Sequence, residues 1–91
     1  MDMKQRYTVN PMIVLREEFD DWAVLFDPDT GDAYGLDPTG VAIWNLLEEK
    51  LPLSGIIKKV ADMFDDVPDN AADEIEAFLK ELLDKGYITN A

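Results

Sequence analysis

Few side chains in this 91-residue chain could carry out covalent chemistry. It contains no Cys and no His, and Ser54 is its one serine. The sequence therefore excludes a thiol nucleophile, an imidazole base or metal ligand, and a Ser/His/Asp triad. Carboxylates are abundant, because 20 Asp and Glu against 8 Lys and Arg give a formal net charge of −12. We expect a protein that is not an enzyme and that uses neither a metal nor a cofactor.

Two local patterns could still indicate a ligand site. An acidic cluster invites a calcium interpretation, but it lacks the alternating EF-hand spacing with its central Gly and terminal Glu. The cluster consists of Asp62, Asp65, Asp66, Asp69 and Asp73. The Thr39-Gly40 pair could contact a phosphate, but it lies in no Gly-rich loop and has no P-loop Lys. We interpret these patterns as a solvated acidic loop and a tight strand-to-helix junction.

Length and composition indicate one small folded domain. The chain is 47% apolar and includes two Trp, three Tyr and four Phe, enough for a single hydrophobic core. Residues 1–6 are polar and charged, unlike a signal peptide, and no apolar run approaches the ~18 residues of a membrane span. We expect a cytoplasmic protein with a flexible tail over residues 1–10 and a domain over residues 11–91.

The first half of the chain reads as short strands. We expect them over residues 12–15, 22–26 and 33–36, where apolar, β-branched and aromatic residues gather. The two-residue period of a strand places Trp22, Val24 and Phe26 on one face. Residues 27–32 contain Pro28 and Gly31 and are typical of a hairpin turn.

The second half reads as three helices. Asp37-Pro38 is typical of a helix start, and the apolar stripe that follows ends near residues 48–50. A second helix is expected from Leu53 to about Phe64, and the acidic link 65–69 follows it. Asn70 is expected to cap a third helix, which Gly86 ends. The predicted fold is α+β and winged-helix-like, a three-stranded antiparallel sheet followed by three helices.

A longer pattern resembles a known family. From Tyr34 to Leu47 the chain reads Y-x-L-D-x-T-G-x-x-I-W-x-L-L, and Phe26-Asp27-Pro28, Gly31, Ile56, Phe64, Phe78-Leu79, Leu82 and Gly86 extend the pattern. The pattern resembles the PqqD-like family, small peptide-recognition domains of pathways that modify ribosomally made peptides. The resemblance runs from about Pro11 to Ile88.

The resemblance implies a recognition element that does no chemistry itself. It would bind the leader of a precursor peptide by strand addition and present it to a modifying enzyme, commonly a radical SAM enzyme. An exposed strand edge supplies unpaired N–H and C=O groups for this kind of binding. The resemblance assigns peptide binding to Asp32, Ala33, Tyr34, Gly35 and Leu36 on the third strand and to Glu74, Phe78, Glu81 and Leu82 on the third helix.

Several of these side chains are first of all candidates for the core. Packing is the more frequent role for Tyr34, Leu36, Trp44, Phe78 and Leu82. On the third helix, Phe78 shares an edge with Glu74, Glu81 and Lys85, whereas Leu83 shares the other edge with Glu76. The sequence does not decide which edge faces the third strand, and we select the edge of Phe78.

Two other functions were compared with peptide recognition. A winged-helix shape raises nucleic-acid binding, but the third helix is acidic and would repel phosphates. A structural or regulatory module that pairs through the same strand edge with another protein, or with a second copy, stays open. We therefore expect partners to be a leader peptide and a modifying enzyme, with no nucleic acid and no membrane.

Overall fold

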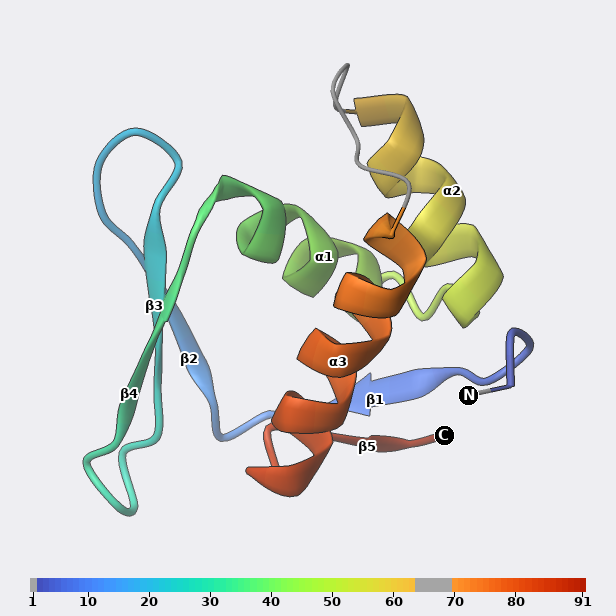
Figure 1. The fold of residues 1–91 in the computed structure, drawn as a ribbon. Helices are drawn as coiled ribbons and strands as arrows, with labels where there is room; N and C mark the ends of the chain where they lie inside the picture. The colour runs from blue at the N-terminus through green and yellow to red at the C-terminus, as the bar shows by residue number, and fades with distance from the viewer. Residues whose placement is uncertain (1, 64–69) are drawn as a thin grey trace.

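The computed structural model describes residues 2–63 and 70–91 and shows two small sheets and three helices (Figure 1). In chain order the elements are β1 (Tyr7–Val9), β2 (Val14–Glu17), β3 (Ala23–Phe26), β4 (Ala33–Leu36), α1 (Pro38–Glu48), α2 (Leu53–Met63), α3 (Ala71–Asp84) and β5 (Ile88–Asn90). The main sheet is antiparallel in the order β2-β3-β4, and the three helices follow it. The predicted α+β, winged-helix-like fold is therefore confirmed.

The first strand of the main sheet begins two residues later than predicted. The amide of Met12 donates to the side chain of Asn10 at 2.9 Å, and the amide of Ile13 donates to the Asn10 carbonyl at 3.1 Å. Asn side chains favour such local turns over the hydrogen-bonded ladder of a sheet. The apolar run from Met12 therefore starts in a turn, and the strand follows at Val14.

The predicted hairpin turn between β3 and β4 is present. The amide of Asp27 donates to the carbonyl of Asp32 at 2.9 Å, and that of Gly31 donates to the carbonyl of Asp27 at 2.8 Å. Gly31 adopts a φ of +80°, which glycine reaches without steric cost. This turn fixes β4 beside β3 over its whole length, from Phe26↔Ala33 to Ala23↔Leu36.

The helix ends follow the sequence signals with one exception. Asp37 accepts a hydrogen bond from the amide of Gly40 at 2.7 Å and caps α1, as predicted. Gly86 (φ +76°) ends α3, where the amide of Tyr87 donates to the carbonyl of Leu82 at 3.0 Å. Asn70 occupies the N-cap position of α3 as predicted, but its side chain forms no cap hydrogen bond. Phe64 and the acidic link 65–69 lie outside the described residues.

The N-terminal segment belongs to the fold, so the expectation of a flexible tail over residues 1–10 was wrong for β1. This strand pairs with β5 in an antiparallel register, from Tyr7↔Asn90 to Val9↔Ile88. The side chain of Tyr7 is completely buried. The preceding carbonyls accept hydrogen bonds from the first amides of α2, including Leu53 to Gln5 at 2.9 Å. A strand of three residues is too short to show a clear pattern in the sequence. Its partner strand also lies at the other end of the chain, so no local turn indicates the pairing.

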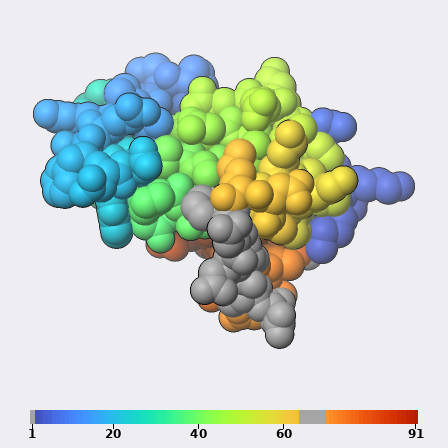
Figure 2. Space-filling view, turned by 90° about the horizontal axis from the view of Figure 1, so that it is seen from above, coloured from blue at the N-terminus to red at the C-terminus, as the bar shows by residue number. Residues whose placement is uncertain are grey.

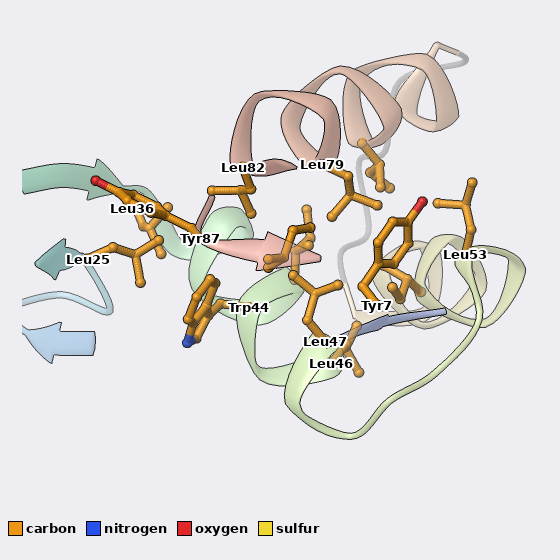
Figure 3. Close-up of a cluster of buried hydrophobic side chains, with 14 of the residues drawn as sticks. Tyr7, Leu25, Leu36, Trp44, Leu46, Leu47, Leu53, Leu79, Leu82 and Tyr87 are labelled. Atoms are coloured by element: carbon orange, nitrogen blue, oxygen red, sulfur yellow. The ribbon is translucent and has the colours of Figure 1, made fainter. Parts of the chain in front are cut away.

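A single hydrophobic core joins the helices to both sheets. Ten of its side chains are labelled in Figure 3, with Leu79 and Leu82 pointing from α3 into the cluster. Trp44 of α1 is 1% exposed and is among the largest buried side chains. In the part of the chain that the structure describes, no helix combines the length and apolar character needed to cross a bilayer.

The raised pKa values of three tyrosines predict how the stability of the domain changes at alkaline pH. Burial is the largest cause that raises the pKa of Tyr7, Tyr34 and Tyr87 above the usual 10.0. Above about pH 10 the unfolded chain releases these protons first, so the free energy of unfolding falls as pH rises. Urea unfolding at about pH 8, 9.5 and 11 should show most of the loss in the last interval. Between about pH 9.5 and 11 the Tyr87→Phe variant should lose less of its free energy of unfolding than the wild-type chain loses. An equal loss in both chains would contradict this account.

Candidate functional site

Strand β4 occupies one edge of the main sheet. Its single neighbour among the described strands is β3, and its other side pairs with no strand in residues 2–63 and 70–91. An unpaired strand edge carries N–H and C=O groups that can bind another extended chain. The open edge was expected from Asp32 to Leu36, and the structure has it over β4, which begins at Ala33 (Figure 1).

The register shows which backbone groups point outward from β4. The Asp27–Asp32 bond marks a hydrogen-bonded pair, and such pairs alternate along an antiparallel ladder. The next pairs bonded to β3 are therefore Leu25↔Tyr34 and Ala23↔Leu36. On β4, the N–H and C=O groups of the residues between them, Ala33 and Gly35, point away from the sheet. Two residues thus offer a donor and an acceptor each to an added strand.

The side chains of β4 alternate between the core and the solvent. Leu36 is 1% exposed and Tyr34 is half-buried, so both face the core. Ala33 and Gly35 are exposed on the opposite face of the sheet. A Cβ atom built on Gly35 would meet no atom within 4 Å, so the backbone there is open to solvent.

Side chains from helix α3 and its C-terminal end lie beside β4, where they contact the ring of Tyr34. The ring centroids of Tyr34 and Phe78 are 6.4 Å apart with an interplanar angle of 40°. The ammonium group of Lys85 lies 5.4 Å from the centroid of the Tyr34 ring, a cation–π contact. Both residues lie on the edge of the third helix that was predicted to face this strand. The prediction that the Phe78 edge faces this strand is confirmed.

Carboxylates determine the electrostatics around Tyr34. Burial raises the pKa of Tyr34, a hydrogen bond to Glu81 raises it further, and the negative charges of Glu81 and Asp37 act in the same direction. The hydroxyl therefore stays protonated at neutral pH and donates toward Glu81. The site combines an aromatic surface, one cation at Lys85 and several carboxylates.

Comparison with known proteins identifies the family of this site. Residues 23–88 match the family model described as Coenzyme PQQ synthesis protein D (PqqD). The chain belongs to the PqqD family. This match includes β3, β4 and all three helices, and therefore every residue of the site described above. No curated protein sequence matches the chain significantly.

A solved structure resembles this PqqD-family chain over nearly its whole length. The structure is described as TbiB1 in complex with the TbiA(beta) leader peptide, and it shares 27% sequence identity with this chain. The TM-score is 0.75, and the match covers 89% of this chain and 93% of the other. The relationship confirms the fold independently of the family model.

The predicted site residues of this PqqD-family chain fall into three groups. Asp32 just before β4 and Ala33 and Gly35 within it are exposed, and Tyr34 and Phe78 are half-buried between the core and the surface. Leu36 and Leu82 are 1% and 0% exposed, so they support the site from within the core. Glu74 and Glu81 are exposed on α3. Glu81 reaches Tyr34, whereas Glu74 lies one turn before Phe78 and accepts a hydrogen bond from Asn70 at 3.4 Å.

Two residues near Tyr34 were absent from the predicted site. Lys85 was placed on the Phe78 edge, but nothing in its spacing indicated that its cation contacts an aromatic ring. Tyr87 packs edge-on against Tyr34, with ring centroids 6.4 Å apart and an interplanar angle of 88°. Its position depends on the reversal of the chain at Gly86. A helical wheel could have found Lys85 but not Tyr87.

Proposed function

We propose that this domain binds the leader segment of a ribosomally made precursor peptide by strand addition to β4. The observation that carries the proposal is the open edge at Ala33 and Gly35, bordered by Tyr34 and Phe78. It is supported by a structural relative at 27% identity that was determined with a leader peptide bound. An added strand would lie about 4.8 Å from β4 and exchange backbone hydrogen bonds with these two residues.

Side chains near the edge would select the leader sequence. In an added strand, alternate side chains point to the same face as Tyr34, where the Phe78 ring offers apolar contact. Carboxylates of Asp32, Asp37 and Glu81 surround this surface, and the whole chain has a net charge of −12. We therefore expect a leader with alternating apolar residues flanked by Lys or Arg. Its association rate should fall as salt rises.

The domain would serve as an adaptor in this function. It would hold the precursor near a modifying enzyme, with a radical SAM enzyme as the expected class, and would do no chemistry itself. Because the precursor is a ribosomal product, we expect the domain to act in the cytoplasm. The expected recognition domain over residues 11–91 should be extended to include β1, since Tyr7 is part of its core.

The proposal is tested by fluorescence anisotropy with a labelled leader peptide. The peptides are taken from precursor genes beside the gene of this chain, and the sequence-scrambled peptide is the control. We expect saturable binding of the native leader that weakens with salt. If no leader binds the folded domain, the edge serves instead in a structural or regulatory module, which is the alternative function.

Replacement of Phe78 should weaken binding more than its effect on stability explains. Phe78→Ala removes a half-buried ring, so we expect the free energy of unfolding to fall by about 2 kcal/mol. Loss of the aromatic contact should weaken leader affinity by about tenfold, measured by calorimetry at a temperature where the domain is folded.

Leu83→Ala provides the matched control for this substitution. Leu83 is also partly buried and packed against the core, but it lies on the opposite edge of α3 from Phe78. This variant should lose similar stability and keep its affinity for the leader. If both variants lose affinity equally, binding responds to helix stability and the Phe78 edge is not part of the site.

A further inference from the structure

The face of the main sheet that points away from the core is apolar. Val14 and Phe26 are directly opposite each other on β2 and β3, with 52% and 40% of their surfaces exposed. Trp22, just before β3, is 50% exposed, and Val24 lies between Trp22 and Phe26 on the same face. The prediction that Trp22, Val24 and Phe26 share a face is confirmed, and this face lies outside the core.

Two further exposed hydrophobic residues flank these strands in the chain. Met12 is 52% exposed just before β2, and Phe19 is 76% exposed in the turn between β2 and β3. We call Met12, Val14, Phe19, Trp22, Val24 and Phe26 the outer sheet face. It contains five of the seven large hydrophobic residues found exposed in the described part of the chain. Such clustering on a small domain is typical of a surface that binds a partner.

Carboxylates border the outer sheet face at both ends. Four of them lie in the β2–β3 hairpin and line a hollow together with Trp22 and Val41: Glu17, Glu18, Asp20 and Asp21. Asp29 lies in the turn at the opposite end, whereas Asp27 and Asp32 lie on the other side of the sheet, near Tyr87. Arg16 is the basic residue on this face, at the position opposite Val24. Figure 2 shows the hairpin, in light blue and cyan, projecting from one end of the molecule.

The hairpin also stores backbone strain at its acidic residues. Asp20 and Asp21 have φ angles of +56° and +65°, a region where Asn and Gly are better tolerated. The turn is closed by the amide of Trp22, which donates to the carbonyl of Phe19 at 3.1 Å. Strained residues of this kind gather at functional sites. Here the strained turn holds two carboxylates beside the exposed rings of Phe19 and Trp22.

The charge of the border identifies the chemistry of the occupant. A second copy would bring its own carboxylates against these residues, and each copy has a net charge of −12. Like charges placed across an interface oppose association. A surface with apolar side chains surrounded by Lys and Arg would satisfy both the apolar centre and the acidic border.

We propose that the outer sheet face docks a partner protein with a basic, apolar-centred surface, and that this partner is the modifying enzyme. The identity of the partner rests on the proposed function. A leader added to β4 would extend the same sheet, and every second side chain of the leader would lie on the side of the outer sheet face. An enzyme docked there would contact the domain and the presented peptide together.

The test uses three purified forms of the domain and the purified modifying enzyme encoded beside its gene. Trp22→Thr combined with Phe26→Thr removes both rings while keeping residues that favour strands. Met63→Gln is the control, since Met63 is 54% exposed at the end of α2, away from the sheet. Enzyme affinity is measured by biolayer interferometry, leader affinity by anisotropy, and mass in solution by sedimentation equilibrium.

The expected result separates this inference from the proposed function. The double variant should bind the enzyme at least about tenfold more weakly than the wild-type domain does. The leader affinities of the double variant and of Met63→Gln should both equal that of the wild-type domain. The affinity of the wild-type domain for the enzyme should also fall as the salt concentration rises. Equal enzyme affinity of all three forms, or a wild-type dimer that the double variant abolishes, overturns the inference. Absence of leader binding to every form would instead overturn the proposed function.

Discussion

Gly35→Pro should abolish leader binding while the domain stays folded. The N–H of Gly35 points away from β3, so proline removes no bond of the main sheet, and proline is tolerated at edge strands. The change removes one donor for the added strand, and the ring occupies space that the peptide backbone needs. We expect affinity to fall by about 100-fold or more, which is about 2.7 kcal/mol. Calorimetric titration with the leader measures this loss.

Gly35→Ala is the matched control for the proline substitution. A Cβ atom at this position meets no atom within 4 Å, and the alanine keeps its N–H. This variant should bind the leader as tightly as the wild-type chain. If Gly35→Pro is folded, as judged by circular dichroism, and binds like Gly35→Ala, then the leader does not pair with this edge.

Tyr7→Ala should destabilise the whole domain, although it lies in a segment whose sequence resembles a tail. The Tyr7 ring is completely buried, and truncation of buried aromatic side chains costs about 3–5 kcal/mol. A chain of this length has a free energy of unfolding of about 5–14 kcal/mol, so the loss is a large part of the total. Urea unfolding followed by far-UV circular dichroism measures the difference.

Thr8→Ala is the control within the same strand. Its side chain is exposed, and surface substitutions of this kind change stability by about 0.5 kcal/mol or less. A Tyr7→Ala variant no less stable than Thr8→Ala would show that β1 is peripheral to the fold. In that case the domain would begin near residue 11, as the sequence pattern predicts.

Local signals in the sequence were sufficient for most of the fold. The third strand was predicted with its observed bounds because the turn at residues 27–32 and the cap at Asp37 fix both of its ends. The pairing of β1 with β5 was not predicted, because it joins residues about 80 positions apart and short strands have no distinctive period. Strand β2 begins at Val14 rather than at Met12 as predicted, because the turn at Asn10 competes with strand formation.

The candidate site was predictable as a set of segments but not as a set of contacts. The family pattern and the helical wheel gave the edge of β4 and the Phe78 edge of α3. Only the structure shows that Lys85 and Tyr87 contact Tyr34, because these contacts depend on how the chain reverses at Gly86. The outer sheet face was also outside the predicted site, since the pattern of Trp22 and Phe26 does not say which sheet face is buried.

Hydrogen exchange of single amides in β4, followed by NMR with and without the leader, tests strand addition most directly. In the free domain, the amides of Tyr34 and Leu36 should be protected by β3, and those of Ala33 and Gly35 should exchange rapidly. Saturating leader should slow Ala33 and Gly35 by about tenfold or more, with chemical-shift changes along residues 74–82. A leader that binds without protecting either amide would contradict strand addition at this edge.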